Sequence, residues 1–357
     1  MTPATGGSRR GYIDWLRGAS VLIMIEAHTL DAWTRLDARH NSTYAWAMIV
    51  GGFAAPAFLF LAGIALALAA GSRLRRGAGA GETAALARRR ALQIFGLAFL
   101  FRLQSWLISG GDPVQVLLKV DILNIMGLSM LAAALLWSAG RARWDRAAWM
   151  LAATVVVAMV TPVVRATPWI SPLPDPIEWY IRPIPGRGTF TLFPWAGFLL
   201  AGAAIGIWLD TARTPDAERR VNVTLAVTGL AVTAAGYAAS YLPALYRESS
   251  FWTTSPTFFF LRVGILILSL PIAYAWNALW TGRSVLQEFG HASLFVYWIH
   301  VELAYGVLSG PMHKALTLGQ AFTAYAIFTI ALFGAAKLKN QIVDWWNTGR
   351  LQPAGAL

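Results

Sequence analysis

The chain has 357 residues, of which 57% are hydrophobic and 13% are charged, and it carries a net charge of +12 and no cysteine. A soluble globule of this composition would have too few polar residues to cover its surface, so the class of water-soluble domains is excluded. The lack of cysteine also excludes disulfides, thiolate catalysis and metal sites ligated by cysteine, and we predict no metal site.

Apolar segments recur along the chain, several of them close to the roughly 20 residues that a helix needs to cross a bilayer. We expect helices because a backbone exposed to lipid must satisfy its own hydrogen bonds. The predicted spans are 12–34, 43–71, 91–109, 115–138, 147–164, 189–209, 222–243, 257–280, 291–309 and 318–336. The sequence therefore predicts an all-α fold, a polytopic integral membrane bundle of about ten transmembrane helices.

The first span follows two arginines but contains Asp14, Arg17 and Glu26, which make it a poor signal-peptide core, so we expect it to be retained. Basic residues lie at span edges, above all in segment 73–90, and do not form a patch for nucleic acid. By the positive-inside rule, we expect this segment and both termini to be cytoplasmic. We expect the membrane to be of the bacterial inner type.

The sequence divides into a cytoplasmic tail at 1–11, one transmembrane domain at 12–336 and a second cytoplasmic tail at 337–357. Segment 166–188, on the other side of the membrane in this topology, holds six prolines, too many for a helix interior. We expect it to form an irregular lid or re-entrant piece. The oligomeric state is not specified by the sequence, and a homodimer is left open.

Ionisable groups inside spans are the first place to look for function, because each costs roughly 2.5–3.5 kcal/mol to insert. In the first span, the spacing of the ionisable residues shows which of them share a helix face. Asp14 and Arg17 are three residues apart and can pair, and Arg17 and His28 also share a face. The candidates are Asp14, Arg17, Glu26, His28, Arg102, Lys119, Asp121, Asn124, Arg262, His291, His300 and Glu302.

His28 suits a general base, since an imidazole can accept and return a proton near neutral pH. The alternative is that His28 only hydrogen-bonds a neighbouring helix. His300 and Glu302 are interpreted as structural or gating residues. Arg88, Arg89 and Arg90 are interpreted first as topology determinants and second as an anion-binding group.

Five motifs resemble the transmembrane acyltransferase superfamily. Residues 9–28, RRGYIDWLRGASVLIMIEAH, resemble its first helix, in which ten residues separate an arginine from a histidine. The other four are APAFLFLAGIALAL, VDILNIMGLSML, LFPWAGFLLAGAAIG and ASLFVYWIHVEL. The nearest branch is that of the heparan-alpha-glucosaminide N-acetyltransferase-like proteins.

The resemblance implies transfer of an acyl group, for which we expect acetyl, from cytoplasmic acyl-CoA to a sugar or glycoconjugate acceptor on the opposite face of the membrane. The implied catalytic residues are His28, Arg17 and Asp14. Binding of the donor, acetyl-CoA or another acyl-CoA, would fall to Arg88, Arg89, Arg90, Lys119 and Asn124. No permanently bound cofactor is implied, and the partners are the lipid bilayer and these two substrates.

One departure from the sequence pattern of this branch leaves open which histidine is the general base. Its catalytic histidine often lies after the first helix, in a His-Ala-x-Trp-like phrase followed by Asp, whereas this chain has RHNSTYAW, with a displaced Trp and no Asp. His40 is therefore a second candidate base behind His28. A transporter or flippase, and a scaffold without chemistry, are the competing functions.

Overall fold

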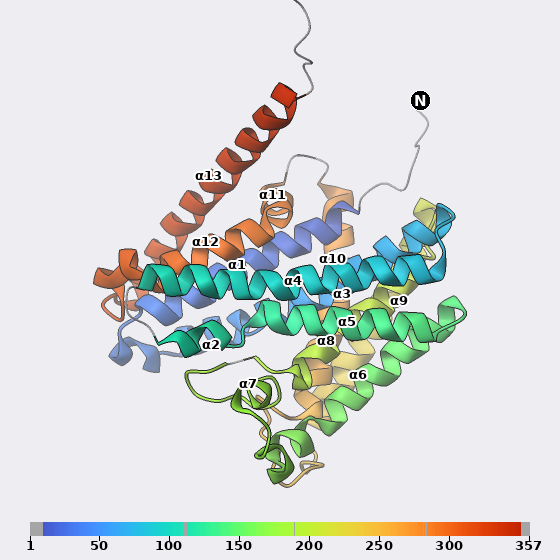
Figure 1. The fold of residues 1–357 in the computed structure, drawn as a ribbon, viewed down its shortest axis with the longest axis horizontal. Coiled ribbons are helices and arrows are strands. Elements are labelled where there is room, and N and C mark those ends of the chain that lie inside the picture. The colour runs from blue at the N-terminus through green and yellow to red at the C-terminus, as the bar shows by residue number, and fades with distance from the viewer. Residues whose placement is uncertain (1–9, 110–112, 189, 281, 283, 351–357) are drawn as a thin grey trace, which may run out of the picture. The chain divides into compact units, whose positions relative to one another are not determined.

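The computed structural model describes residues 10–350 except 110–112, 189, 281 and 283. The parts of the predicted tails at 1–9 and 351–357 lie outside the described residues. The described chain is mostly helical and contains no strand (Figure 1). It divides into two compact units, one built mainly from residues 55–280 and one from residues 14–54 and 284–350.

The first unit contains α4 (Ala80–Ser109), α5 (Ile122–Ala139), α6 (Arg143–Ala166), α7 (Asp175–Glu178), α8 (Leu192–Leu209), α9 (Pro215–Ala239), α10 (Pro256–Leu279) and nearly all of α3 (Ala54–Arg75). The second unit contains most of α1 (Gly11–Trp33), then α2 (Ser42–Gly51), α11 (Val285–His291), α12 (Ser293–Tyr305) and α13 (Leu318–Arg350). Short 3-10 turns are η1 (Leu36–His40), η2 (Val114–Leu118), η3 (Pro168–Ile170) and η4 (Val307–Met312).

Eight helical segments of the described chain are long and apolar enough to cross a membrane, so the predicted fold class is confirmed. They are Ser42–Arg75, Ala80–Ile108, Ile122–Ala139, Arg143–Ala166, Leu192–Leu209, Pro215–Ala239, Pro256–Leu279 and Leu318–Trp346. The first and ninth predicted spans are not among them. Helix α1 carries too many charges, and α12 has only 13 residues, fewer than a crossing needs.

The predicted start of the fourth span at residue 115 is wrong. Residues Val114–Leu118 form η2, and helix α5 begins only at Ile122. The side chain of Asp121 accepts hydrogen bonds from the backbone N–H groups of Leu123 and Asn124, and the side-chain oxygen of Asn124 accepts one from the backbone N–H of Asp121. This capping box satisfies the free N–H groups of the first turn and so sets the helix start.

Within the first unit, α4 packs against α5, α6 against α8, and α9 against α10, as neighbouring helices in Figure 1. Helices α3 and α8 approach most closely through small residues. A Cβ at Gly202 would overlap the carbonyl oxygen of Phe60, and one at Gly63 would overlap that of Leu199. Without a hydrophobic effect between helices in lipid, such backbone contact is what holds apolar helices together.

The second unit uses the same device where α1 meets α11. A Cβ at Gly290 would overlap the backbone carbonyl of Asp14, and one at Gly18 would overlap that of Leu286.

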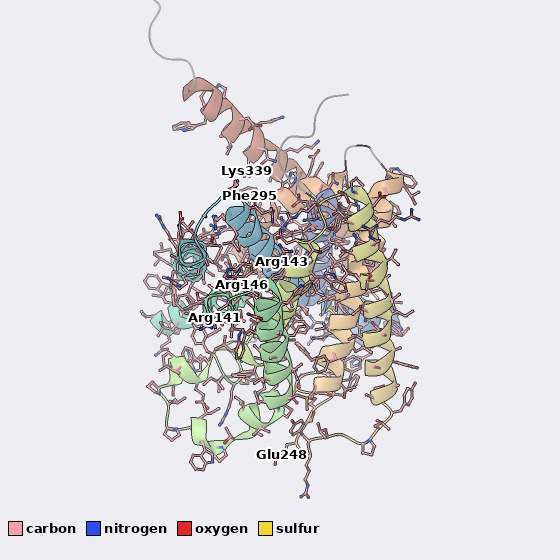
Figure 2. All side chains as sticks on the ribbon, turned by 90° about the vertical axis from the view of Figure 1, so that its right-hand side faces the viewer. Arg141, Arg143, Arg146, Glu248, Phe295 and Lys339 are labelled. Atoms are coloured by element: carbon pink, nitrogen blue, oxygen red, sulfur yellow. The ribbon has the colours of Figure 1, made fainter. Side chains whose placement is uncertain are left out.

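Helix α13 contacts α12 through a cation and an aromatic ring. The Lys339 ammonium of α13 lies 5.9 Å from the ring centroid of Phe295 in α12, and Figure 2 labels both residues. Helix α13 continues to Arg350, through the predicted tail boundary at 336.

The proline-rich segment between α6 and α8 forms only η3, the four-residue α7 and turns, as its composition predicts. Its Tyr180 is held at the start of α5, because Asn124 Nδ2 donates to the phenol oxygen at 3.2 Å. Burial, and secondarily the nearby Asp121 carboxylate, raises the pKa of Tyr180 to about 12, so this phenol is neutral at physiological pH. The segment is therefore irregular but anchored.

The α3–α8 contact generates a stability prediction. Gly202→Ala forces the two backbones apart, and overpacking of this kind costs about 1–3 kcal/mol, so we expect a lower melting temperature in detergent. The matched control is Gly96→Ala in α4, where a Cβ meets nothing within 4 Å. The control should melt at or above the wild-type temperature, because alanine favours a helix over glycine. Equal melting temperatures for Gly202→Ala and wild type would contradict the close packing.

Candidate functional site

Two histidines, far apart in the sequence, meet in the second unit. His28 Nδ1 on α1 lies 2.7 Å from His300 Nε2 on α12. The ring centroids are 5.0 Å apart and the ring planes differ by 7°, so with this short nitrogen contact the imidazoles meet edge to edge in nearly one plane. That is the geometry of a hydrogen bond between ring nitrogens.

The other contacts of His300 decide which nitrogens carry protons. His300 Nδ1 lies 2.9 Å from the carbonyl oxygen of Val296 and 2.8 Å from that of Tyr297. A carbonyl can only accept, so Nδ1 carries the proton and Nε2 of the neutral ring is an acceptor. His28 Nδ1 must then be the donor, which leaves the lone pair on His28 Nε2 unprotonated.

The positions of the two rings are fixed by a second contact between α1 and α12, on the C-terminal side of His28 and His300. Trp33 Nε1 donates to the carbonyl oxygen of Ala304 at 2.9 Å. Both residues are buried, together with Ala32, in a small apolar cluster of this unit. His300 itself is fully buried, so its rotamer is set by packing as well as by its hydrogen bonds.

A polar group that sequence reasoning did not single out lies beside His28. The Tyr305 ring stands edge-on to the His28 ring at 5.6 Å between centroids, and its hydroxyl donates to Asp31 Oδ2 at 2.9 Å. Asp31 also lies 3.5 Å from Arg39 Nη1. One signal was available, since Asp31 follows His28 by three residues and so shares its helix face. Tyr305 had no such signal.

Asp14 and Arg17 do pair, with Arg17 Nη1 2.9 Å from Asp14 Oδ1, and His291 Nε2 lies 3.3 Å from the other carboxylate oxygen. Asp14 is buried, and this group joins α1 to the end of α11. The structure does not bring it to His28. Arg17 and His28 are separated by about 16 Å along α1 at 1.5 Å per residue.

His40 is not part of the histidine pair. It ends η1 with an exposed side chain. Within the described ranges its imidazole makes no hydrogen bond or ion pair, so nothing selects its tautomer or orients its ring. Of the two candidate bases, only His28 has a fixed orientation.

The candidate donor-binding residues fall into two groups. Arg88, Arg89 and Arg90 are consecutive near the start of α4, with Arg89 and Arg90 exposed. Successive helical residues are turned by about 100°, so these three fan out and do not converge on one anion. They form a broad basic surface at that end of the helix.

Lys119 and Asn124 belong to the other end of α4. Asp121 lies between them in the sequence and pairs with Arg102 at 3.3 Å, and Arg102 is about 18 Å along α4 from Arg90. Asn124 is buried and engaged by the capping box and by Tyr180. The five residues therefore do not form a single site. Over the described part of the chain, no cluster of three or more His, Asp or Glu side chains is arranged to hold a metal ion.

Comparison with known proteins supports the motif resemblance. No curated protein matches the chain. A family model described as heparan-alpha-glucosaminide N-acetyltransferase, catalytic, matches residues 9–242, which is more than half of the chain. The match includes His28 and His40 but ends before His300. The chain therefore belongs to the heparan-alpha-glucosaminide N-acetyltransferase catalytic family, a family of membrane acetyltransferases.

Proposed function

We propose that this protein transfers an acetyl group from acetyl-CoA to an amine or hydroxyl of a sugar or glycoconjugate, with the donor entering from the cytoplasm and the acceptor from the opposite side. The observation that carries the proposal is the His300–His28 hydrogen bond, which leaves one ring nitrogen of His28 as an oriented base. Family membership supports the reaction class. The concentration of arginines in segment 73–90 supports the sidedness.

In this mechanism His28 Nε2 takes the proton from the acceptor nucleophile as that atom attacks the thioester carbonyl. The tetrahedral intermediate collapses, the carbon–sulfur bond breaks, and the thiolate of CoA leaves. The imidazolium of His28 then returns its proton to the thiolate or to solvent, so the enzyme ends as it began. General-base catalysis of this kind contributes about 10²- to 10⁴-fold.

His300 acts through His28 as a positioning residue. It accepts the Nδ1–H of His28, which fixes the tautomer that exposes Nε2, and it is itself fixed by the carbonyls of Val296 and Tyr297. The same bond steadies the His28 imidazolium once it has formed, because the acceptor nitrogen faces the charged ring. The Asp14–Arg17 pair, far along α1 from His28, supports the helix arrangement instead.

The phosphates of the donor are assigned to the basic surface of Arg88, Arg89 and Arg90 as charge partners. Lys119 and Asn124 lie toward the other end of α4 and are not part of that surface.

The first test compares the two candidate bases. We expect His28→Gln to lower the rate of acetyl transfer by about 10²- to 10⁴-fold, because the base is lost. His40→Gln should leave the rate near that of wild type. The measurement is transfer of labelled acetyl from acetyl-CoA to glucosamine as acceptor probe, with the purified protein in liposomes. Loss of transfer in His40→Gln alone would reverse the assignment.

The second test addresses His300. In His300→Leu the Nδ1–H of His28 loses its acceptor, so we expect kcat to fall at least about tenfold while KM for acetyl-CoA stays constant. His300→Gln should recover much of the rate, because the amide oxygen can accept from His28 and its NH₂ can donate to the helix carbonyls. Equal losses in both variants, with KM altered, would indicate a merely structural residue.

The third test addresses the donor. We expect calorimetry of the detergent-purified protein to show acetyl-CoA binding that survives His28→Gln and weakens at least about tenfold when Arg88, Arg89 and Arg90 are all changed to Gln, since charge-assisted bonds contribute about 1.5–3 kcal/mol each. Lys119→Gln should bind as wild type does. Absence of binding to folded wild-type protein would overturn the proposed donor.

A further inference from the structure

A cavity of about 180 Å³ lies within the first unit, where the ends of four helices meet. About 15 Å³ of such space holds one water, so the cavity has room for a polyatomic group. The lining comes from the end of α3, the end of α5, the start of α6 and the end of α8. The residues are Ala67, Gly71, Leu74, Arg75, Trp137, Arg143, Arg146, Ile207 and Asp210.

The polar groups of this lining are mostly hydrogen-bond donors. Trp137 is 5% exposed, and its indole N–H has no acceptor among the described residues. Arg146, 8% exposed, has its guanidinium 5.0 Å from the Trp137 ring centroid, and its Nε donates to the carbonyl oxygen of Gly140 at 3.1 Å. A buried donor without an acceptor costs stability, which points to an acceptor supplied by a ligand or water.

The one acidic side chain among the described lining residues is already engaged. Asp210 Oδ1 and Oδ2 lie 2.6 and 2.7 Å from Arg75 Nη1, and Oδ2 also accepts from Arg213 Nη2 at 2.9 Å. Gly71 makes this arrangement possible, because a Cβ there would overlap the carboxylate. With Arg75 matched by Asp210, the positive charges of Arg143 and Arg146 remain uncompensated within the lining.

Arg143 is the residue best placed to receive a ligand. Its side chain is exposed and makes no hydrogen bond or ion pair within the described part of the chain. The nearby Asp145 carboxylate instead accepts from the backbone N–H of Ala142 at 2.9 Å. Figure 2 shows Arg141, Arg143 and Arg146 together at the start of α6, while Glu248 lies at the opposite end of this unit. The positive end of the α6 dipole adds to their field.

We propose that this cavity binds a phosphate group. The groups without an acceptor among the described residues are the Arg143 guanidinium, the two Nη groups of Arg146 and the Trp137 indole N–H. All of them are donors, and a tetrahedral oxyanion presents acceptors in several directions at once. Guanidinium groups match phosphate oxygens in pairs. The same chemistry is offered by the headgroup of an anionic phospholipid and by the phosphates of a nucleotide thioester, so the proposal does not depend on which reaction the protein catalyses.

The test uses the full-length protein and two phosphate probes. The first arm measures thermal unfolding in nanodiscs of phosphatidylcholine with and without phosphatidylglycerol. The second measures calorimetric binding of CoA and of dephospho-CoA, which lacks the 3′-phosphate. A phosphatidylglycerol-dependent rise in melting temperature that is lost in Arg143→Gln identifies a lipid headgroup as the ligand. A weakening of CoA binding without the 3′-phosphate that is likewise lost in Arg143→Gln identifies the nucleotide, whereas a weakening that persists in this variant belongs to the surface of Arg88, Arg89 and Arg90.

The variants are chosen so that folding is preserved. Arg143→Gln removes an exposed side chain, and Trp137→Phe keeps the ring under Arg146 but removes the N–H. We expect each to reduce the effective probe's binding or its stabilisation, Arg143→Gln by about tenfold or more in affinity. Arg141→Gln, which removes the same charge from a residue outside the lining, should behave as wild type. Failure of both probes to bind wild-type protein, or equal responses of the Arg141 and Arg143 variants, would overturn the proposal.

Discussion

Hydrocarbon offers no hydrogen-bonding partner, so an ionisable side chain within an apolar helix has to find one in the protein. The described structure meets this constraint with short-range pairs. The ion pairs are Arg17–Asp14, Arg102–Asp121 and Arg75–Asp210. In each pair one partner lies at or near the end of a helix, where a free backbone group or water can also hydrogen-bond to the charged side chain.

The histidine pair meets the constraint differently. His28 and His300 are neutral partners in which one ring donates and the other accepts, and the chain of bonds ends on two backbone carbonyls of α12. Among the residues that the structure describes, each ring nitrogen of the two histidines has a hydrogen-bond partner except His28 Nε2. A site that has to accept a proton needs one such free nitrogen, held in a fixed direction, and the arrangement supplies it without burying a charge.

Close backbone packing makes these polar arrangements possible. Gly290 lets α11 approach α1 closely enough for His291 to reach Asp14, and Gly71 leaves room for the Asp210 carboxylate against α3. Glycine in a helix interior carries an intrinsic penalty of about 1 kcal/mol. Here the penalty is offset by polar contacts that a larger residue would exclude. Packing and electrostatics are therefore coupled at both places.

The sequence by itself determined the fold class, the family resemblance, the Asp14–Arg17 pair and His28 as a candidate base, because each depends on composition, on motifs or on residues within three turns of one helix. It misplaced the start of α5, since the cap at Asp121 competes with an apolar run that continues before it. Only the tertiary structure decided that His300 is the partner of His28, that Lys119 lies far from Arg90, and that Trp137 and Arg146 share a cavity with Asp210. These relations join helices distant in sequence, and helical periodicity specifies which face a residue occupies but not which neighbouring helix that face will meet.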